Sequence, residues 1–490
     1  MADIEDKTKV ADVLMQKEAS FEAVAASEAL SPAEDRRLLR RADMWLLPVL
    51  FVTYMFQYLD KSTMANAAIL GLRSDLHLQG QDYSWASSVF NFGYLAASGP
   101  IAFIIVRLPI GKFMSVSVLL WGAVLMCMAA TKNSSGLIAT RFFLGFMEAA
   151  VAPGFSIIVS LWYKRSEQPL RTGVWFLGNI VSGFFAGPLM YAFGHIHSYP
   201  AWKIVFLTFG GLTVVWGAVM FFILPDAPGK AWFFRPEDRP KAVLRINADS
   251  TGVKHNKWKM DQFWEALCDP KAWFTALLML ATNIPNGGIS NFAAIVIHGF
   301  GFSVNETFLV NMIVTAFQGF FVLVVTIGST YLPNSRTYFM MAGSTIGLIG
   351  AVVIRQLDNS NIWARYSGYC LLSAYTTNFP MILVMNTSNN AGITKKTTVN
   401  AMSFVAYCVG NIVGPQLFFD SEAPNYPSGF AAMLVCFCVT ILATFALRLY
   451  LIWCNKKKDR ISGPVEDQAL ATELEDDRTD REMDHFRYIY

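Results

Sequence analysis

The stretch GLIATRFFLGFMEAAVAPGFSIIVSLW, which runs from Gly136 to Trp162, decides the fold because it is long and apolar enough to cross a lipid bilayer. It nevertheless contains Arg141 and Glu148. A charged side chain at the bilayer centre costs roughly 2.5–3.5 kcal/mol on insertion scales, so such residues usually face protein partners, water or a ligand. Arg141 and Glu148 are nearly two helical turns apart, about 10 Å along the axis, and therefore share one face that we expect to point inward.

A second pair of charges, Asp60 and Lys61, ends another long apolar run. If this run and the 136–162 stretch cross the membrane in opposite directions, the carboxylates of Asp60 and Glu148 differ in depth by only several Å at about 1.5 Å per residue. The four charges at membrane depth, Asp60, Lys61, Arg141 and Glu148, are called the central charges below. A carrier that couples protons to an anion needs at least acids that take up and release protons and bases that hold the anion.

Each central charge has an expected role. The acids Asp60 and Glu148 are predicted to take up and release protons. An anion that occupies Lys61 or Arg141 would weaken the hold of that cation on the acids and favour their protonation, so that proton and anion travel together. The planar guanidinium of Arg141 suits a carboxylate, the ammonium of Lys61 is a compact point charge, and the sequence leaves open which of them contacts the substrate. The alternative is that these charges merely tie the first span to the fourth.

Composition narrows the class of protein. Of the 490 residues, 54% are hydrophobic and 15% charged, which is too apolar for a soluble globule and predicts a polytopic membrane protein. The net charge of +3 is small and the basic residues are dispersed, so no nucleic-acid partner is expected. Nothing resembles a nucleotide-binding loop, a hydrolase triad or a zinc site, so we expect no enzyme, cofactor or metal.

Apolar windows of about 20 residues divide the chain into two halves. They lie near 43–68, 83–105, 113–131, 136–163, 172–194, 202–224, 271–299, 304–330, 336–354, 362–386, 398–420 and 426–454. We therefore predict an all-α membrane protein with twelve transmembrane helices in two six-helix bundles, 43–224 and 271–454. The remaining segments are an N-terminal segment (1–42), a central loop (225–270) and an acidic tail (455–490), all expected to be cytoplasmic.

The basic residues between the apolar runs indicate the orientation. Most of them fall on one side of the membrane if the amino terminus is cytoplasmic, including the groups at 36–41 and 456–458. This asymmetry predicts that both termini are cytoplasmic. Two six-span halves also predict a substrate site at the midplane between them, in a protein that we expect to act as a monomer.

Polar residues in the second half suit a wall of that site. The segment 282–291 contains Asn283, Asn286, Pro285 and two glycines, which we expect to interrupt the helix and expose backbone to a binding cavity. The alternative is a kink that serves packing alone.

Two later runs add neutral hydrogen-bonding side chains that suit a polar organic ligand: Asn378, Asn400, Ser403 and Tyr407. For each of these residues the alternative is a hydrogen bond between neighbouring helices.

Several motifs resemble a known family. They include Leu59-Asp-Lys, Arg141-Phe-Phe-Leu-Gly-Phe-Met-Glu-Ala, Ile284-Pro-Asn-Gly-Gly-Ile, Gly392-Ile-Thr-Lys-Lys and Gly410-Asn-Ile-Val-Gly-Pro. Over nearly its whole length the chain resembles the fungal allantoate permease group of the anion:cation symporters, within the major facilitator superfamily. In more distant relatives the functional acid and base of the first span match Asp60 and Lys61, although the base there is commonly Arg.

This resemblance implies a multi-pass protein of the plasma membrane that imports a small organic anion together with protons by alternating access. Allantoate or ureidosuccinate, or a carboxylate vitamin such as nicotinate or pantothenate, are the substrates it suggests. Two alternatives stay open: a metabolite exporter or facilitator, and a nutrient sensor that binds its ligand without moving it.

Overall fold

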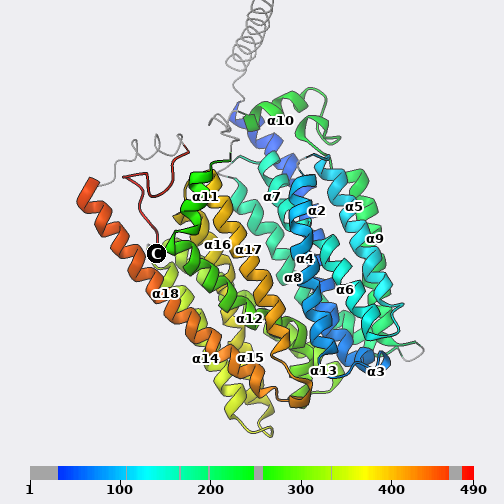
Figure 1. The fold of residues 1–490 in the computed structure, drawn as a ribbon. Helices are drawn as coiled ribbons and strands as arrows, with labels where there is room; N and C mark the ends of the chain where they lie inside the picture. The colour runs from blue at the N-terminus through cyan, green and yellow to red at the C-terminus, as the bar shows by residue number, and fades with distance from the viewer. Residues whose placement is uncertain are drawn as a thin grey trace, which may run out of the picture.

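The computed structural model describes residues 31–105, 107–164, 167–196, 199–247, 258–332, 334–462 and 477–490. Each of the three segments predicted to lie outside the membrane falls partly outside these ranges, at 1–30, 248–257 and 463–476. The described residues form helices and no strand (Figure 1). The predicted all-α class is therefore confirmed.

The first half of the chain forms one bundle. Its helices are α2 (Pro32–Ala67), η1 (Ala68–Leu72), α3 (Arg73–Asp75), α4 (Asp82–Ile105), α5 (Ile110–Met128), α6 (Ser134–Glu148), α7 (Val151–Trp162), α8 (Gln168–Gly194) and α9 (Ala201–Ile223). Within it α2 packs against α8 and α9, α4 against α6, and α5 against α9. Two short elements follow in the central loop, η2 (Pro228–Lys230) and α10 (Asp238–Asn247).

The second half forms another bundle. Its helices are α11 (Met260–Leu267), α12 (Pro270–Gly299), α13 (Val304–Tyr331), α14 (Arg336–Gln356), α15 (Ile362–Leu372), η3 (Ser373–Thr377), α16 (Asn378–Asn389), α17 (Ile393–Gln416), η4 (Asp420–Glu422) and α18 (Pro427–Ser462). Here α12 packs against α17 and α18, and α14 against α15 and α18. The two bundles meet along three helix pairs: α2 with α12, α4 with α17, and α8 with α13.

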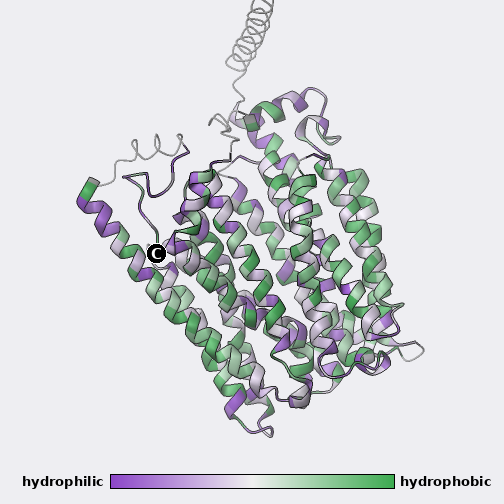
Figure 2. Cartoon of the chain, in the orientation of Figure 1, coloured by the Kyte–Doolittle hydropathy of each residue, from purple (hydrophilic) through white to green (hydrophobic). Residues whose placement is uncertain are grey.

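Within the described ranges, nine helical stretches are long and apolar enough to cross a membrane. Three further long stretches, α12, α15 through α16, and α17, carry more polar residues and complete the twelve predicted spans. Figure 2 shows hydrophobic residues along the bundle helices and hydrophilic residues gathered toward their ends. The three more polar spans all lie in the second bundle, in which the sequence predicts the polar wall of a binding site.

The hydrogen bonds between the two bundles gather toward one end of the molecule. The start of α2, α10, α11 and the carboxyl end lie at the end that we call the terminal side, and α3 lies at the opposite, distal side (Figure 1). Tyr83 Oη donates to the Asn291 carbonyl (2.6 Å), and Ser88 Oγ donates to the Ile412 carbonyl (2.7 Å). Among the described residues, the hydrogen bonds between the bundles lie at the level of Lys61 or distal to it.

The predicted interruption of the helix at 282–291 is wrong, because α12 continues from Pro270 to Gly299. The glycines there allow close packing instead. A Cβ on Gly287 would lie 2.8 Å from Asn411 Cα, and one on Gly414 would lie 2.3 Å from the Ile284 carbonyl oxygen. The packing alternative therefore accounts for this motif. Interruptions occur elsewhere, at Gly71 (φ 102°) in η1 and between α6 and α7, directly after Glu148.

Residues 477–490 return to the terminal side of the second bundle. Asn389 Nδ2 donates to the Ile489 carbonyl (2.8 Å) and its Oδ1 accepts from the Ile489 amide (2.7 Å). Asn455 makes the same pair of bonds with Tyr488 (2.8 and 2.9 Å). These bonds fix the end of the chain between α16 and α18.

A group of six charged side chains, four of them buried, accompanies this segment. We call it the tail cluster, and its members are Glu265, Asp269, Lys271, Lys395, Asp480 and Arg481. Lys395 Nζ lies 2.7 Å from Asp480 Oδ1 and 2.9 Å from Asp269 Oδ2, and these three side chains are 0% exposed. Lys271 pairs with both carboxylates as well. Burial raises the pKa of Asp480, but the charges of Lys271 and Lys395 outweigh it and lower the pKa to about 2.

Candidate functional site

The two predicted proton-binding carboxylates are buried and each is only partly satisfied. Asp60 Oδ2, on α2, accepts a hydrogen bond from Thr213 Oγ1 on α9 (3.2 Å), and Trp121 lies close enough to act on the same carboxyl. Glu148 Oε1, at the end of α6, accepts from Gln57 Nε2 on α2 (3.0 Å). Among the described residues, Asp60 Oδ1 and Glu148 Oε2 are buried without a hydrogen-bond partner. An unsatisfied buried carboxylate oxygen is costly, and such an atom suits a proton or a ligand donor.

The two cations lie beside these acids without pairing with them. The Arg141 side chain is buried, its Nε donates to the Ala86 carbonyl (3.3 Å), and its guanidinium carbon lies 5.1 Å from the centre of the Phe90 ring. Lys61 Nζ donates across to Tyr407 Oη on α17 (3.4 Å). No ion pair within 4.0 Å joins any two of the central charges, all of which the structure describes.

The central charges nevertheless act on one another. Both Lys61 and Arg141 interact electrostatically with Glu148, and Glu148 interacts with Asp60. Near the central charges, the first and fourth spans are joined by the hydrogen bond of Gln57 to Glu148. The ion pair of Asp35 on α2 with Lys164 after α7 (2.8 Å) involves none of the central charges. The alternative, that the central charges tie these spans together, therefore has no ion pair among them to carry it. The proton and anion roles of the central charges stay predictions.

Amide side chains of the second bundle form a chain of hydrogen bonds. Asn286 Nδ2 on α12 donates to Asn411 Oδ1 on α17 (3.0 Å), and Asn411 Nδ2 donates to Asn283 Oδ1 (3.3 Å). Tyr375 Oη of η3 lies 3.5 Å from Asn286 Oδ1. Asn286 is half-buried, whereas Asn283 is fully buried. Three elements of the second bundle thus meet at one polar patch.

One face of α17 looks toward the first bundle. Asn400, Phe404, Tyr407 and Asn411 are spaced by three or four residues and share this face. The Phe404 ring lies 5.6 Å from the Tyr94 ring of α4, and Tyr407 accepts the bond from Lys61. Asn400 is exposed and lies nearest the terminal side on this face.

Two predicted ligand residues lie inside the second bundle. Asn378 Nδ2 donates to Ser344 Oγ on α14 (2.7 Å), and Ser403 Oγ accepts from Asn386 Nδ2 on α16 (2.7 Å). These are bonds between helices of one bundle, as the alternative for these residues proposed. A role of Asn378 or Ser403 in ligand binding stays a prediction.

The structure adds two residues to the predicted site. Gln57 carries a signal, because it is a polar residue in an apolar run, one helical turn before Lys61. Thr213 has no such signal in the sequence, because a threonine in an apolar helix usually bonds to its own backbone. The contact of Thr213 with Asp60 depends on how α9 packs on α2.

Comparison with known proteins gives a consistent result. The family model described as Major Facilitator Superfamily matches residues 50–415. The chain is similar to an uncharacterized transporter of Schizosaccharomyces pombe (35% identity, 94% of this chain and 91% of the relative). It is also similar to the allantoate permease of Saccharomyces cerevisiae (32% identity, 94% of this chain and 87% of the relative).

Among solved structures, a bacterial homologue of the human lysosomal transporter Spinster, in an inward-facing and unoccupied conformation, has a similar fold. The TM-score is 0.63 at 14% identity, and the match covers 86% of this chain and 97% of that one. The resemblance read from the sequence motifs is therefore confirmed.

Proposed function

The chain belongs to the major facilitator superfamily, and we propose that it is a proton-coupled symporter that imports a small organic anion by alternating access. One observation carries the proposal: Asp60, Arg141 and Glu148 are buried between spans and Lys61 is half-buried, yet no ion pair joins any two of these central charges. Buried charges are usually paired or serve an ion pathway or a substrate. The central charges include two cations that can bind a mobile anion and two acids that can bind a mobile proton.

The cations receive the anion in this account. Lys61 is half-buried and reaches from α2 toward α17, so it attracts the substrate into the space between the bundles. Arg141 offers a planar fork that fits a carboxylate in two parallel hydrogen bonds. Among the described residues, its guanidinium makes one bond to a backbone carbonyl and one ring contact, so donors remain for a substrate.

The acids carry the proton. An anion that neutralises Lys61 or Arg141 weakens the attraction of that cation for the Glu148 carboxylate, so binding of the anion and protonation of Glu148 favour each other. Asp60 accepts a hydrogen bond from Thr213 and serves as the second proton site.

The second bundle recognises the rest of the substrate. Asn283 and Asn286 present amide groups from α12, and Asn400 and Tyr407 present polar groups from α17. Such groups suit a carboxylate that also carries amide or ureido groups. Allantoate is therefore the first substrate to test, since an allantoate permease is among the relatives, followed by ureidosuccinate, nicotinate and pantothenate.

We place the protein in the plasma membrane as a monomer, with both termini in the cytoplasm. In that orientation the bonds between the bundles close the outer end, and the inner end is the side to which substrate is released. Rocking of the bundles would break the distal bonds and expose the central charges to the outside.

The test uses the full chain in proteoliposomes with radiolabelled allantoate and an imposed inward proton gradient. The wild-type protein is expected to accumulate the label against its gradient. Glu148→Gln is expected to lose uphill accumulation while it keeps exchange of internal for external substrate. The matched control Glu237→Gln, at an exposed position, is expected to accumulate like the wild type.

Proton-driven accumulation by Glu148→Gln would refute the proposal. If allantoate is not moved, growth of a permease-deficient yeast on single nitrogen, sulfur or vitamin sources selects the next substrate. Movement that ignores the proton gradient would indicate a facilitator or exporter, and binding without movement would indicate a sensor.

A further inference from the structure

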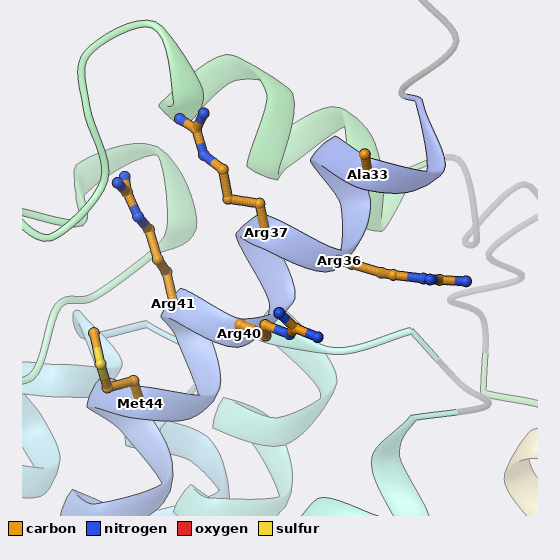
Figure 3. A pocket seen from close by; sticks show the side chains of 6 residues that line it. All are labelled: Ala33, Arg36, Arg37, Arg40, Arg41 and Met44. Atoms are coloured by element: carbon orange, nitrogen blue, oxygen red, sulfur yellow. The ribbon is translucent and has the colours of Figure 1, made fainter.

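The start of α2 carries four arginines on two successive turns, directly before the membrane-spanning part of the same helix. Together with Ala33 and Met44, the residues Arg36, Arg37, Arg40 and Arg41 line a hollow of about 460 Å³ (Figure 3). This hollow lies on the terminal side, away from the central charges near the other end of α2. We propose that it binds the head group of an anionic phospholipid.

The charge of the hollow is only partly compensated. Arg37 and Arg41 share one carboxylate, that of Asp238 on α10, at 2.7 and 3.3 Å. Arg36 and Arg40 are exposed, and no ion pair joins either of them to a described residue. In Figure 3 the side chains of Arg36 and Arg40 point away from those of Arg37 and Arg41. Positive charge therefore remains for a bound anion.

The position of the hollow identifies a lipid as the source of that anion. Met44, one turn beyond Arg40, is 61% exposed, as expected where the helix enters lipid. Trp45 packs edge-on against Trp232 (4.5 Å between ring centres), and Trp232 is 47% exposed. Tryptophans gather at the level of lipid head groups, so the arginines begin at that level. A phospholipid whose phosphate is held by the arginines would place its acyl chains beside Met44 and Trp232.

Guanidinium groups bind phosphate in bidentate geometry, and clusters of four to eight basic residues next to a membrane span are typical of anionic lipid recognition. Because α2 carries Asp60 and Lys61, the head group anchors the helix on which two of the central charges lie.

The test is native mass spectrometry of the full chain in detergent, titrated with short-chain phosphatidylserine, short-chain phosphatidylcholine or inorganic phosphate. We expect one saturable phosphatidylserine and weaker binding of the other two probes. Arg36→Gln with Arg40→Gln is expected to weaken phosphatidylserine binding on the order of tenfold, and Arg36→Lys with Arg40→Lys to weaken it less. Lys456→Gln with Lys457→Gln removes two exposed charges on the same side and is the matched control.

Three results would overturn the proposal. The first is wild-type affinity in the Arg36→Gln, Arg40→Gln variant. The second is an equal loss in the lysine control, which would mean that the effect is one of general charge. The third is binding of inorganic phosphate as tight as that of phosphatidylserine, which would make the ligand a free anion. The thermal unfolding of each variant without lipid shows whether it is folded, since all four substituted residues are exposed.

Discussion

The central charges and the tail cluster are both mostly buried, but they differ in how their charges are matched. Each member of the tail cluster lies within 4.0 Å of an opposite charge. The central charges interact only at longer range and leave two carboxylate oxygens without partners. Burial is costly for both groups, and only the tail cluster offsets that cost with fixed partners. We therefore propose a structural role for the tail cluster, whose charges have fixed partners, and a transport role for the central charges, which have no ion pair with one another.

Removal of one unmatched charge tests this difference first, because it has the largest expected effect. Arg141→Gln is expected to weaken substrate binding by about 100-fold or more, since hydrogen bonds to charged groups contribute roughly 1.5–3 kcal/mol each and two are lost. Its Tm is expected to stay at or above that of the wild type, because an unpaired buried charge is removed. The measurements are uptake kinetics and thermal unfolding of the same preparation. A lower Tm with unchanged KM would mean that Arg141 is structural.

Removal of one matched charge is expected to do the reverse. Asp480→Asn leaves Lys271 and Lys395 short of a carboxylate, and breaking a buried pair costs about 3–5 kcal/mol. We expect a clearly lower Tm while the KM of correctly folded protein stays close to that of the wild type. The matched control is Asp459→Asn, which removes an exposed carboxylate on the same side. An unchanged Tm in Asp480→Asn would break the comparison.

The pH dependence of stability sharpens the contrast. The pKa of Asp480 is lowered to about 2 in the folded protein, so its contribution to stability is present above its ordinary pKa of 3.8 and is lost as the pH falls toward 2. Between pH 5 and 8 the contribution of Asp480 to stability is therefore constant, and we expect a Tm that changes little over that range. Uptake is expected to change over the same range. A Tm that follows the uptake profile would show that the two groups are not separate.

The smallest expected effect concerns the contact between the bundles. Tyr407→Phe removes the acceptor of the Lys61 ammonium, a single hydrogen bond of 3.4 Å. We expect KM to change by about two- to tenfold, the equivalent of roughly 0.5–1.5 kcal/mol, with coupling to protons retained. Uptake at a series of substrate concentrations measures this change. Loss of proton coupling in this variant would place Tyr407 on the proton path and not in the binding wall.

The spans and the central charges could be predicted because they depend on local sequence. Long apolar runs indicate helices that cross lipid. Acids and bases within such runs indicate ion pairs, an ion pathway or a substrate site, because an unpaired charge in lipid is costly. The predicted ends of most spans therefore lie within a few residues of the observed ends. The start of α2 at Pro32 was missed because the predicted span begins where the apolar run begins, whereas the helix begins at the capping box of Ser31 and Glu34.

Features that depend on distant contacts could not be predicted. The glycines at 287 and 288 read as helix breakers, and only the closeness of α17 shows that they serve packing. Asp480 lies in a charged tail, and nothing in its neighbourhood indicates that Lys271, more than 200 residues earlier, buries it. Asn378 and Ser403 bond to other helices of their own bundle, and the sequence alone does not show in which direction their side chains point.

The most direct test of the central claim is the proton flux that accompanies the anion. A pH-sensitive dye inside proteoliposomes reports internal acidification when substrate is added outside at zero pH gradient. The account predicts acidification with the wild-type protein, and none with Glu148→Gln under conditions where that variant still exchanges labelled substrate. Substrate entry without acidification in the wild type, or equal acidification in Glu148→Gln, would contradict it.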